Sequence, residues 1–205
     1  MSPLRIVLPR GVRFARPGEI PMKAPDDVVW GSEADIAPGV VTQPGRPPAF
    51  DVYAEANVDA PKLWSLFEAL VRALLPSTAA PLIGVKGEAP HKGHYTDRDL
   101  ALAEFRPFRD ALENDGYIHF GMIFQHDGVT EEVYVEPAKY LKVWSSRRDV
   151  LRAVFAQFGI PEVQKLSFLD EFPRVTDAIP FEGASPGYAH VLEALQAAFA
   201  TLPER

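Results

Sequence analysis

The sequence predicts an α+β fold, in which an antiparallel β-meander packs against several amphipathic helices. The prediction begins from the pair Asp127-Gly128, which separates two runs of alternating apolar residues and is the strongest short-range pattern for a two-residue β-hairpin. This hairpin spans residues 117–136, and a further strand is expected at 139–144. Before and after these strands, apolar residues recur every three or four positions, which is typical of amphipathic helices.

The first 49 residues are rich in proline, from Pro3 to the run PGRPP at 44–48. Proline fixes φ and removes a backbone donor, so this stretch can contribute at most turns and short edge strands. We therefore expect residues 1–49 to form an extended segment that wraps the molecule, and residues 50–205 to form a single α+β domain.

Regular elements begin at Phe50. The run FDVYAEA alternates like a strand, and Asp59 is a suitable N-cap for a helix that ends before Pro76. The residues expected on the buried side of this helix are Leu63, Leu66, Phe67, Leu70, Val71 and Leu74.

A second strand and helix precede the hairpin. The run PLIGVKG at 81–87 predicts a short strand, and Thr96 followed by Asp99 has the spacing of a capping box that opens a helix. Pro107 should kink or divide this helix because it lacks a backbone donor. The residues expected on its buried side are Leu100, Leu102, Phe105, Phe108 and Leu112.

A two-residue loop at 127–128 fixes the register of the hairpin. Residue 126 then pairs with 129, residue 125 with 130, and so on along both strands. The core face then carries Ile118, Phe120, Met122 and Phe124. His119 and His126 lie an odd number of residues apart on one strand, so they point to opposite sides of the sheet and cannot share a metal.

The opposite face combines aromatic, histidine and acidic side chains, a composition that favours a recognition surface. In this register His119 lies opposite Glu136, and Tyr134 covers the space left by Gly121. Alternatively, helices or the proline-rich segment cover this face and His119 and Glu136 form an ordinary cross-strand pair. With two acids of a neighbouring loop added, the residues expected to bind a partner are Tyr117, His119, Glu132, Tyr134, Glu136, Tyr140, Trp144, Asp170 and Glu171.

The remaining elements follow the meander. Ser146 and Asp149 predict the start of a helix that Gly159 closes before Pro161. Residues 165–181 predict a short strand followed by an acidic loop, and residues 187–202 predict a last amphipathic helix. In the helix that ends at Gly159, the side chains expected to face inward are Val150, Leu151, Val154, Phe155 and Phe158.

Composition narrows the class of protein. The formal net charge is −7, which argues against broad nucleic-acid binding because that binding depends on Lys and Arg. A negative charge can attract a basic protein partner, and the alternative is that it only keeps the protein soluble. No apolar run is long enough for a membrane span or a signal peptide, so we expect a cytoplasmic protein without membrane contact. The absence of cysteine excludes disulfides and thiolate metal sites.

A histidine site is the alternative that the sequence leaves open. The run PHKGH places His91 and His94 three residues apart, but its proline and glycine indicate a loop, where this spacing fixes no geometry. Zinc would need a third ligand. The candidates are Asp97, His119 and Glu136, and the set His91, His94 and His119 would suit a metal-dependent hydrolase.

The run GASPG at 183–187 matches the G-x-S-x-G motif of hydrolase nucleophiles. Pro186 follows Ser185 and has no N–H to donate to an oxyanion hole, so we interpret the motif as the start of the last helix. The sequence contains no phosphate-binding loop and no dinucleotide fingerprint, and we expect no cofactor.

Residues 131–176 carry a resemblance to a known family. The run EEVYVEPAKYLKVWSSRRDVLRAVFAQFGIPEVQKLSFLDEFPRVT is similar to the strand, strand, helix and FLDEFP ending of some small bacterial immunity proteins that neutralise toxins. The resemblance implies an inhibitor that binds a toxin domain, and the acidic character of the chain would suit a basic toxin.

The sequence therefore favours a non-catalytic protein-binding module, of the immunity-protein type, that occludes a toxin or enzyme partner with the aromatic and acidic sheet face. Two alternatives stay open: the metal-dependent hydrolase and a structural or scaffold component. The sequence leaves the oligomeric state and the identity of the partner open.

Overall fold

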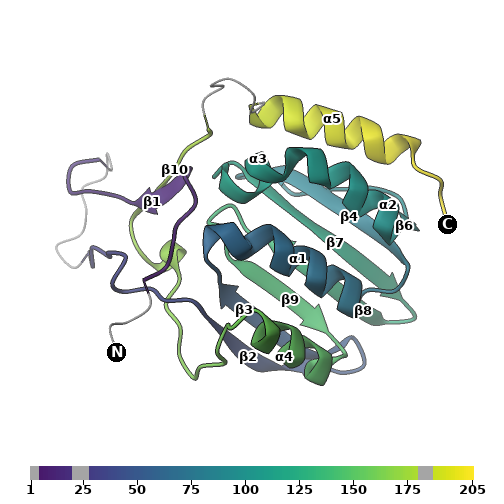
Figure 1. The fold of residues 1–205 in the computed structure, drawn as a ribbon, viewed down its shortest axis with the longest axis horizontal. Coiled ribbons are helices and arrows are strands. Elements are labelled where there is room, and N and C mark those ends of the chain that lie inside the picture. The colour runs from purple at the N-terminus through teal and green to yellow at the C-terminus, as the bar shows by residue number, and fades with distance from the viewer. Residues whose placement is uncertain (1–4, 20–27, 180–186) are drawn as a thin grey trace.

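The computed structural model describes residues 5–19, 28–179 and 187–205, and Figure 1 shows the α+β architecture that they form. Within these ranges eight strands make one antiparallel sheet in the order β2-β3-β9-β8-β7-β4-β5, with β6 paired to β4. The ribbon of β1 (Val12–Phe14) and β10 (Arg174–Thr176) is separate. The strands of the large sheet are β2 Gly39–Arg46, β3 Phe50–Asn57, β4 Thr78–Val85, β5 His91–Lys92, β6 Thr96–Asp97, β7 Ile118–His126, β8 Val129–Val135 and β9 Leu141–Ser145.

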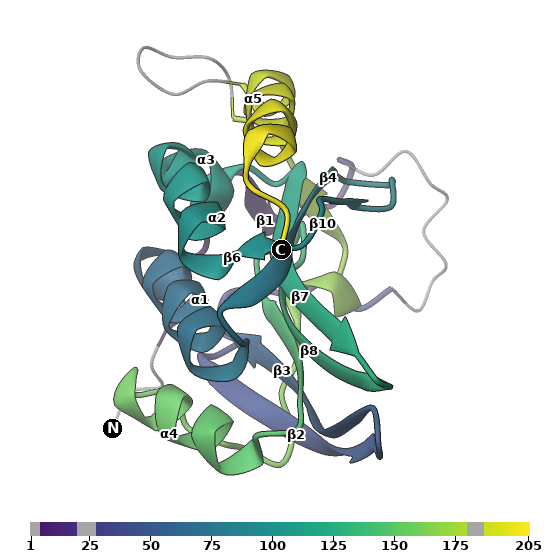
Figure 2. The same cartoon turned by 90° about the vertical axis from the view of Figure 1, so that its right-hand side faces the viewer.

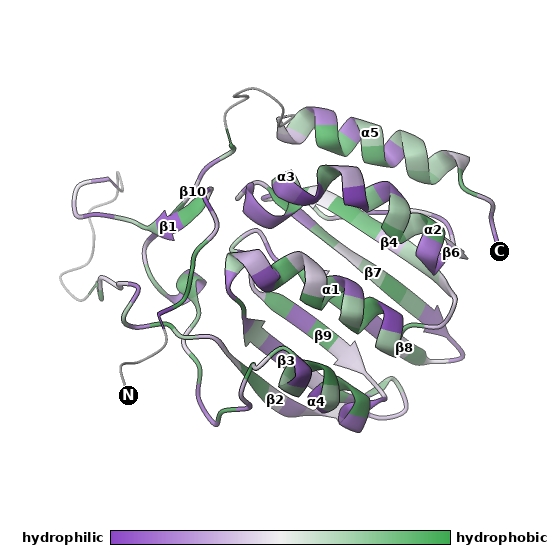
Figure 3. Ribbon diagram, in the orientation of Figure 1, coloured by the Kyte–Doolittle hydropathy of each residue, from purple (hydrophilic) through white to green (hydrophobic). Residues whose placement is uncertain are grey.

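Helices cover one face of this sheet. Figure 2 shows α1 to α4 on the same side, and α5 packs against β4 and α2. Figure 3 shows that apolar and polar residues alternate along α1 and α4, and the apolar residues predicted on α1 are all buried. None of the helices in the described ranges combines the length and the apolarity that crossing a bilayer requires. The helices are α1 Ala60–Leu74, α2 Arg98–Phe105, α3 Arg109–Asn114, α4 Arg148–Gln157 and α5 Tyr188–Thr201.

The hairpin of β7 and β8 has the predicted register. Phe120 pairs with Val135 and Met122 with Val133. Asp127 has φ 49° and Gly128 has φ 80°, and positive φ at both central residues is what a two-residue turn of type I′ requires. The predicted third strand begins at Leu141 rather than at 139, because the turn before it holds Lys139 at φ 61°.

An aromatic cluster joins the sheet to the helices. The ring of Phe120 on β7 lies 4.9 Å from that of Phe67 on α1, and Phe105 on α2 lies 6.2 Å from Phe67 and 5.0 Å from Phe199 on α5. All four side chains are buried, and burying one such ring stabilises a fold by about 2–3 kcal/mol. The packing therefore connects β7 to three helices.

Two predicted helix starts are displaced. The N-cap of α2 is Asp97, whose carboxylate accepts from the N–H groups of Asp99 and Leu100, so the predicted cap Thr96 was wrong by one residue. The N-cap position of α4 is Arg147, and the hydroxyl of the predicted cap Ser146 donates instead to Glu131. At α2 the neighbouring Asp97 thus takes the predicted role, whereas at α4 no side chain caps the helix.

Asp59 lies at the predicted N-cap position of α1, but its carboxylate does not cap the helix. Instead it accepts the N–H of Val7, and the carbonyl oxygen of Val7 accepts the N–H of Ala60 at 2.8 Å. The N-terminal segment thus supplies the acceptor that satisfies a free donor of α1.

Two residues predicted to face inward are exposed. Leu100 is 44% exposed and Val150 is 39% exposed, because α2 buries Ala101, Leu102 and Phe105, and α4 buries Leu151, Val154 and Phe155. Pro107 divides its helix as predicted, since a 3₁₀ turn at Arg106–Phe108 separates α2 from α3.

The segment after α4 has the reverse of its predicted order. Residues 165–168 form no strand, a 3₁₀ turn at Leu169–Glu171 comes first, and β10 follows and pairs with β1. Val12 of this ribbon packs in a small apolar cluster with Ile6, Ile36 and Leu169. Within the first 49 residues, β2 forms the edge of the large sheet, where Pro44 is tolerated because one side of the strand is unpaired.

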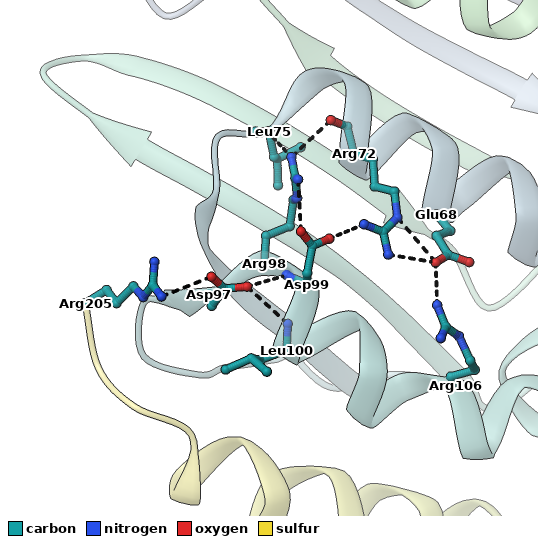
Figure 4. Close-up of polar contacts among 9 residues, drawn as sticks. All are labelled: Glu68, Arg72, Leu75, Asp97, Arg98, Asp99, Leu100, Arg106 and Arg205. Atoms are coloured by element: carbon teal, nitrogen blue, oxygen red, sulfur yellow. Dashed lines mark hydrogen bonds and ion pairs between the residues drawn. The ribbon is translucent and has the colours of Figure 1, made fainter.

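An ion-pair network fastens α1 to α2 and to the C-terminal tail (Figure 4). The Glu68 carboxylate accepts from Arg106 at 2.7 Å and from Arg72 at 3.1 Å, and Arg72 also binds Asp99. Arg205 pairs with Asp97 at 3.2 Å. The arginines and Asp99 are exposed, Glu68 and Asp97 are partly exposed, and their charges are matched. The network is therefore a structural contact worth about 1 kcal/mol or less per pair.

Lys139 is a buried cation, with 3% of its surface exposed. Its ammonium donates to the carbonyl oxygens of Leu112 (2.8 Å) and Ile118 (2.6 Å) and lies over the ring of Phe120. Burial lowers the pKa of Lys139 to about 7, against the opposing field of Asp115. The turn between β8 and β9 is thereby tied to the junction of α3 and β7.

The depressed pKa of Lys139 predicts that stability rises with pH. The folded chain binds fewer protons than the unfolded chain between pH 7 and the ordinary lysine pKa near 10.5, so the free energy of unfolding should increase across this window. Relative to Lys139→Met, the wild-type gain from pH 7 to pH 10 should be on the order of 2–4 kcal/mol in urea denaturation. Parallel pH profiles for the two proteins would contradict this assignment.

Candidate functional site

The sheet face turned away from α1–α4 is here termed the back face. One row of cross-strand neighbours crosses it, with Tyr53 of β3 paired to Trp144 of β9, Trp144 paired to Glu132 of β8, and Glu132 paired to Ile123 of β7. The adjacent row contains Glu55, Lys142, Tyr134 and Gly121. The predicted alternation therefore places most of the expected recognition residues on one face.

His119 and Tyr134 form a buried pair within this face, with 3% and 9% exposure. The Tyr134 hydroxyl donates to Nδ1 of His119, and the Nε2–H of His119 donates to the carbonyl oxygen of Val85 at 2.8 Å. Burial lowers the pKa of His119, mainly by removing its ring from water. The imidazole is therefore neutral, and both of its nitrogens bond within the protein.

Two glycines make the space for this pair. A Cβ on Gly84 would lie 2.5 Å from Cε1 of His119, and a Cβ on Gly121 would lie 2.8 Å from Cδ2 of Tyr134. Tyr134 thus covers Gly121 as predicted. Only glycine permits so close an approach of a side chain to a neighbouring strand.

The expected contact of His119 with Glu136 is absent from the described structure. The β7–β8 ladder ends at Phe120 and Val135, and Glu136 forms an ion pair with Lys142 at 2.6 Å. Glu136 acts on His119 only through its field. The ammonium of Lys142 is a stronger partner for the carboxylate than a buried neutral imidazole.

Other expected site residues are covered or lie at the margin. Tyr140 is buried against Phe168, and its hydroxyl donates to Asp170 at 2.9 Å. Glu171 accepts the N–H of Phe168 within the 3₁₀ turn, and Tyr117 packs against Tyr188 of α5. These contacts remove Tyr140 from solvent and place Tyr117 beside α5.

The uncovered part of the back face is centred on Trp144. Its ring lies 5.0 Å from that of Tyr53, and both side chains are partly exposed. A cavity of about 550 Å³ adjoins them. Its lining consists of Gln43, Pro44, Arg46, Phe50, Tyr53 and Trp144.

Glu132 stands beside this aromatic pair. Its carboxylate is half-buried next to Ile123, Tyr134 and Trp144, and within the described ranges it makes no hydrogen bond or ion pair. Burial raises the pKa of Glu132 to about 7, although Lys92 opposes the shift. Lys92 itself lies over the ring of Tyr95.

The histidines proposed as metal ligands are not gathered. His119 has no free nitrogen, Nε2 of His94 donates to the carbonyl oxygen of Leu202 at 2.8 Å, and His91 is exposed on β5. In the part of the chain that the structure describes, no three metal-ligating side chains come together. Gly183–Pro186 of the G-x-S-x-G motif lie outside the described residues.

A second cavity, of about 390 Å³, lies between α4 and the edge strand β2. Its floor includes Val40, Leu151, Phe155 and Ile160, and Arg152 and Glu162 pair beside it at 3.0 Å. The lining is mostly apolar, and its charged residues neutralise each other.

In comparisons with protein-family models, with curated proteins and with solved structures, no match to this chain was found.

The sequence interpretation missed Tyr53 and Gln43 as parts of the site. The alternating pattern of the predicted strand at 50–56 points the Tyr53 side chain away from the core, so its orientation could have been predicted. Its position beside Trp144 depends on the pairing of β3 with β9, which local patterns do not specify.

Because Gly84 lies so close to His119, adding one methyl group at Gly84 should destabilise the fold. Gly84→Ala should lower the free energy of unfolding by about 1–3 kcal/mol in urea denaturation, because the new Cβ would overlap the imidazole. Gly39→Ala on β2 is the matched control, since its Cβ would make ordinary contacts at 3.4 Å and should change stability by about 0.5 kcal/mol or less. Equal losses in the two variants would refute the steric explanation.

Proposed function

We propose that this chain is a non-catalytic protein-binding module that holds a basic partner against the uncovered part of its back face. The observation that carries the proposal is the half-buried, unpaired carboxylate of Glu132 beside the partly exposed rings of Tyr53 and Trp144 within the described structure. Aromatic side chains next to a charged group are the usual centre of a protein interface.

The charge of this face supports a basic partner. Glu55, Glu132, Glu136 and Asp170 lie on it or at its margin, and Lys142 neutralises Glu136. The pKa of Tyr53 is raised, first by burial and then by Glu55, and the fields of Glu136 and Asp170 act in the same direction. With a chain charge of −7, this face would attract a cationic surface at long range.

Binding is favoured over catalysis by the state of the histidine in this face. A general base needs a free nitrogen near the substrate, whereas both nitrogens of His119 bond to Tyr134 and Val85. Glu132 remains as an acid with a pKa of about 7, but no partner group that would complete a catalytic pair is bonded to it among the described residues.

The partner that we propose is a toxin domain, and the proposed role is that of an immunity-type inhibitor in the bacterial cytoplasm. The support is the resemblance of residues 131–176 to immunity proteins, because Glu132 and Trp144 both lie within that segment. Such an inhibitor would occlude the active surface of its partner.

The experiment is partner capture from the native host with the tagged full chain. Trp144→Ala should lose most of any protein recovered by the wild type, because truncating a central aromatic anchor costs about 2 kcal/mol or more, a reduction of roughly thirtyfold in affinity. Glu193→Lys, on the exposed side of α5, is the control and should retain the partner. Undiminished recovery by Trp144→Ala, or recovery of no protein by the wild type, would contradict the proposal.

A further inference from the structure

The Glu132 carboxylate lies in surroundings that disfavour its charge. Its cross-strand neighbours are Trp144 on one side and Ile123 on the other, and Tyr134 follows on the same face of β8. Leu82, Ile123, Tyr134 and Trp144 belong to one apolar cluster. Placing a carboxylate among such groups is unfavourable unless a cation or hydrogen-bond donors compensate it.

Within the described ranges, no hydrogen-bond donor and no ion-pair partner contacts the Glu132 carboxylate. Lys142 is bound to Glu136, and Lys92 lies 5.0 Å from the centre of the Tyr95 ring. Lys92 therefore affects Glu132 through its field without forming an ion pair. The missing element is a cation that can reach the carboxylate from solvent.

The neighbouring aromatic rings define the shape of that cation. Trp144 stands between Glu132 and Tyr53 in the row of cross-strand neighbours. The cavity of about 550 Å³ is lined by the rings of Trp144 and Tyr53 and not by Glu132, so the carboxylate lies beside the cavity, next to Trp144. A planar guanidinium can lie on an indole ring and donate in-plane N–H groups to an adjacent carboxylate at the same time. A lysine ammonium has no plane to stack and is more strongly hydrated.

We propose that the surface formed by the Trp144 ring and the neighbouring Glu132 carboxylate, here termed the arginine pocket, receives one arginine side chain of the partner, with its guanidinium stacked on Trp144 and bonded to Glu132. The inference rests on the proposed binding function and adds to it the chemical identity of the anchoring group. Arginine is also among the residues that most often dominate interface energies.

Arg46 lines the cavity that adjoins the arginine pocket at Trp144, and its charge opposes the binding of a cation there. It is exposed on the turn side of β2, where water and salt screen its charge. Arg46 nevertheless provides a sensitive test, because removing its side chain should strengthen the binding of a cation and weaken the binding of an anion.

The test is a titration of the full chain with a short oligoarginine peptide, and with the same peptide carrying citrulline in place of arginine. Citrulline keeps the shape of the side chain and removes its charge. The NMR signal of the Trp144 indole N–H, assigned with Trp144→Phe, reports binding at the pocket. The arginine peptide should shift this signal and the citrulline peptide should not.

The variants separate this pocket from general attraction to an acidic protein. Glu132→Gln should weaken binding about fivefold or more, and Arg46→Ala should strengthen it about twofold, whereas Glu193→Gln on α5 should leave it unchanged. Equal binding of both peptides, no effect of Glu132→Gln, or weaker binding by Arg46→Ala would each overturn the arginine pocket. Circular dichroism of every variant verifies that it is folded.

The outcomes also distinguish this inference from the proposed function. If partner capture fails with Trp144→Ala but is unaffected by Glu132→Gln, the back face binds a partner through an apolar anchor and the arginine assignment is wrong. If the arginine peptide binds as described but capture of a partner does not depend on Trp144, the arginine pocket is supported and the proposed protein-binding function is contradicted.

Discussion

The structure depends on the register that the two-residue turn at Asp127-Gly128 imposes on β7 and β8. Both residues adopt positive φ, and the pairing that follows turns Phe120 and Met122 toward α1. A slip of one residue would exchange the two faces of β7, so that His119 would enter the aromatic core and Phe120 would leave it. The core and the candidate site are therefore determined by the same turn.

The register decides which side chains reach the back face, but their neighbours decide which of them meet solvent. His119 packs closely against Gly84 and Tyr134 against Gly121, because neither glycine has a side chain, and Phe168 covers Tyr140. Near Trp144 the structure has no such cover among its described residues, and a cavity adjoins the ring. A face that looks continuous in sequence is thus divided into a packed part and an accessible part.

Local patterns in the sequence were sufficient for the hairpin, for α1 and for the division of a helix at Pro107, because each depends on residues close in the chain. The cap of α2 was misplaced by one residue because Thr96 and Asp97 are both suitable caps. The predicted cap of α4 was wrong because Ser146 bonds to Glu131, which is distant in sequence, and no side chain caps the helix. The pairing of β3 with β9 joins residues far apart in sequence, so the contact of Tyr53 with Trp144 could not be predicted. The burial of Lys139 was likewise missed, since its two carbonyl acceptors belong to α3 and β7.

Glu132 differs from the buried charged side chains in having no partner among the described residues. Lys139 is more deeply buried, yet two carbonyl oxygens and an aromatic ring surround its ammonium. The buried Glu131 accepts two hydrogen bonds from Ser146, and Glu136 binds Lys142. Among these charges in the described structure, Glu132 alone is withdrawn from water without a partner, and it is also the one beside an accessible aromatic pair. Because an uncompensated carboxylate opposes folding, its position is better explained by a cation that arrives with a ligand than by a role in the fold itself.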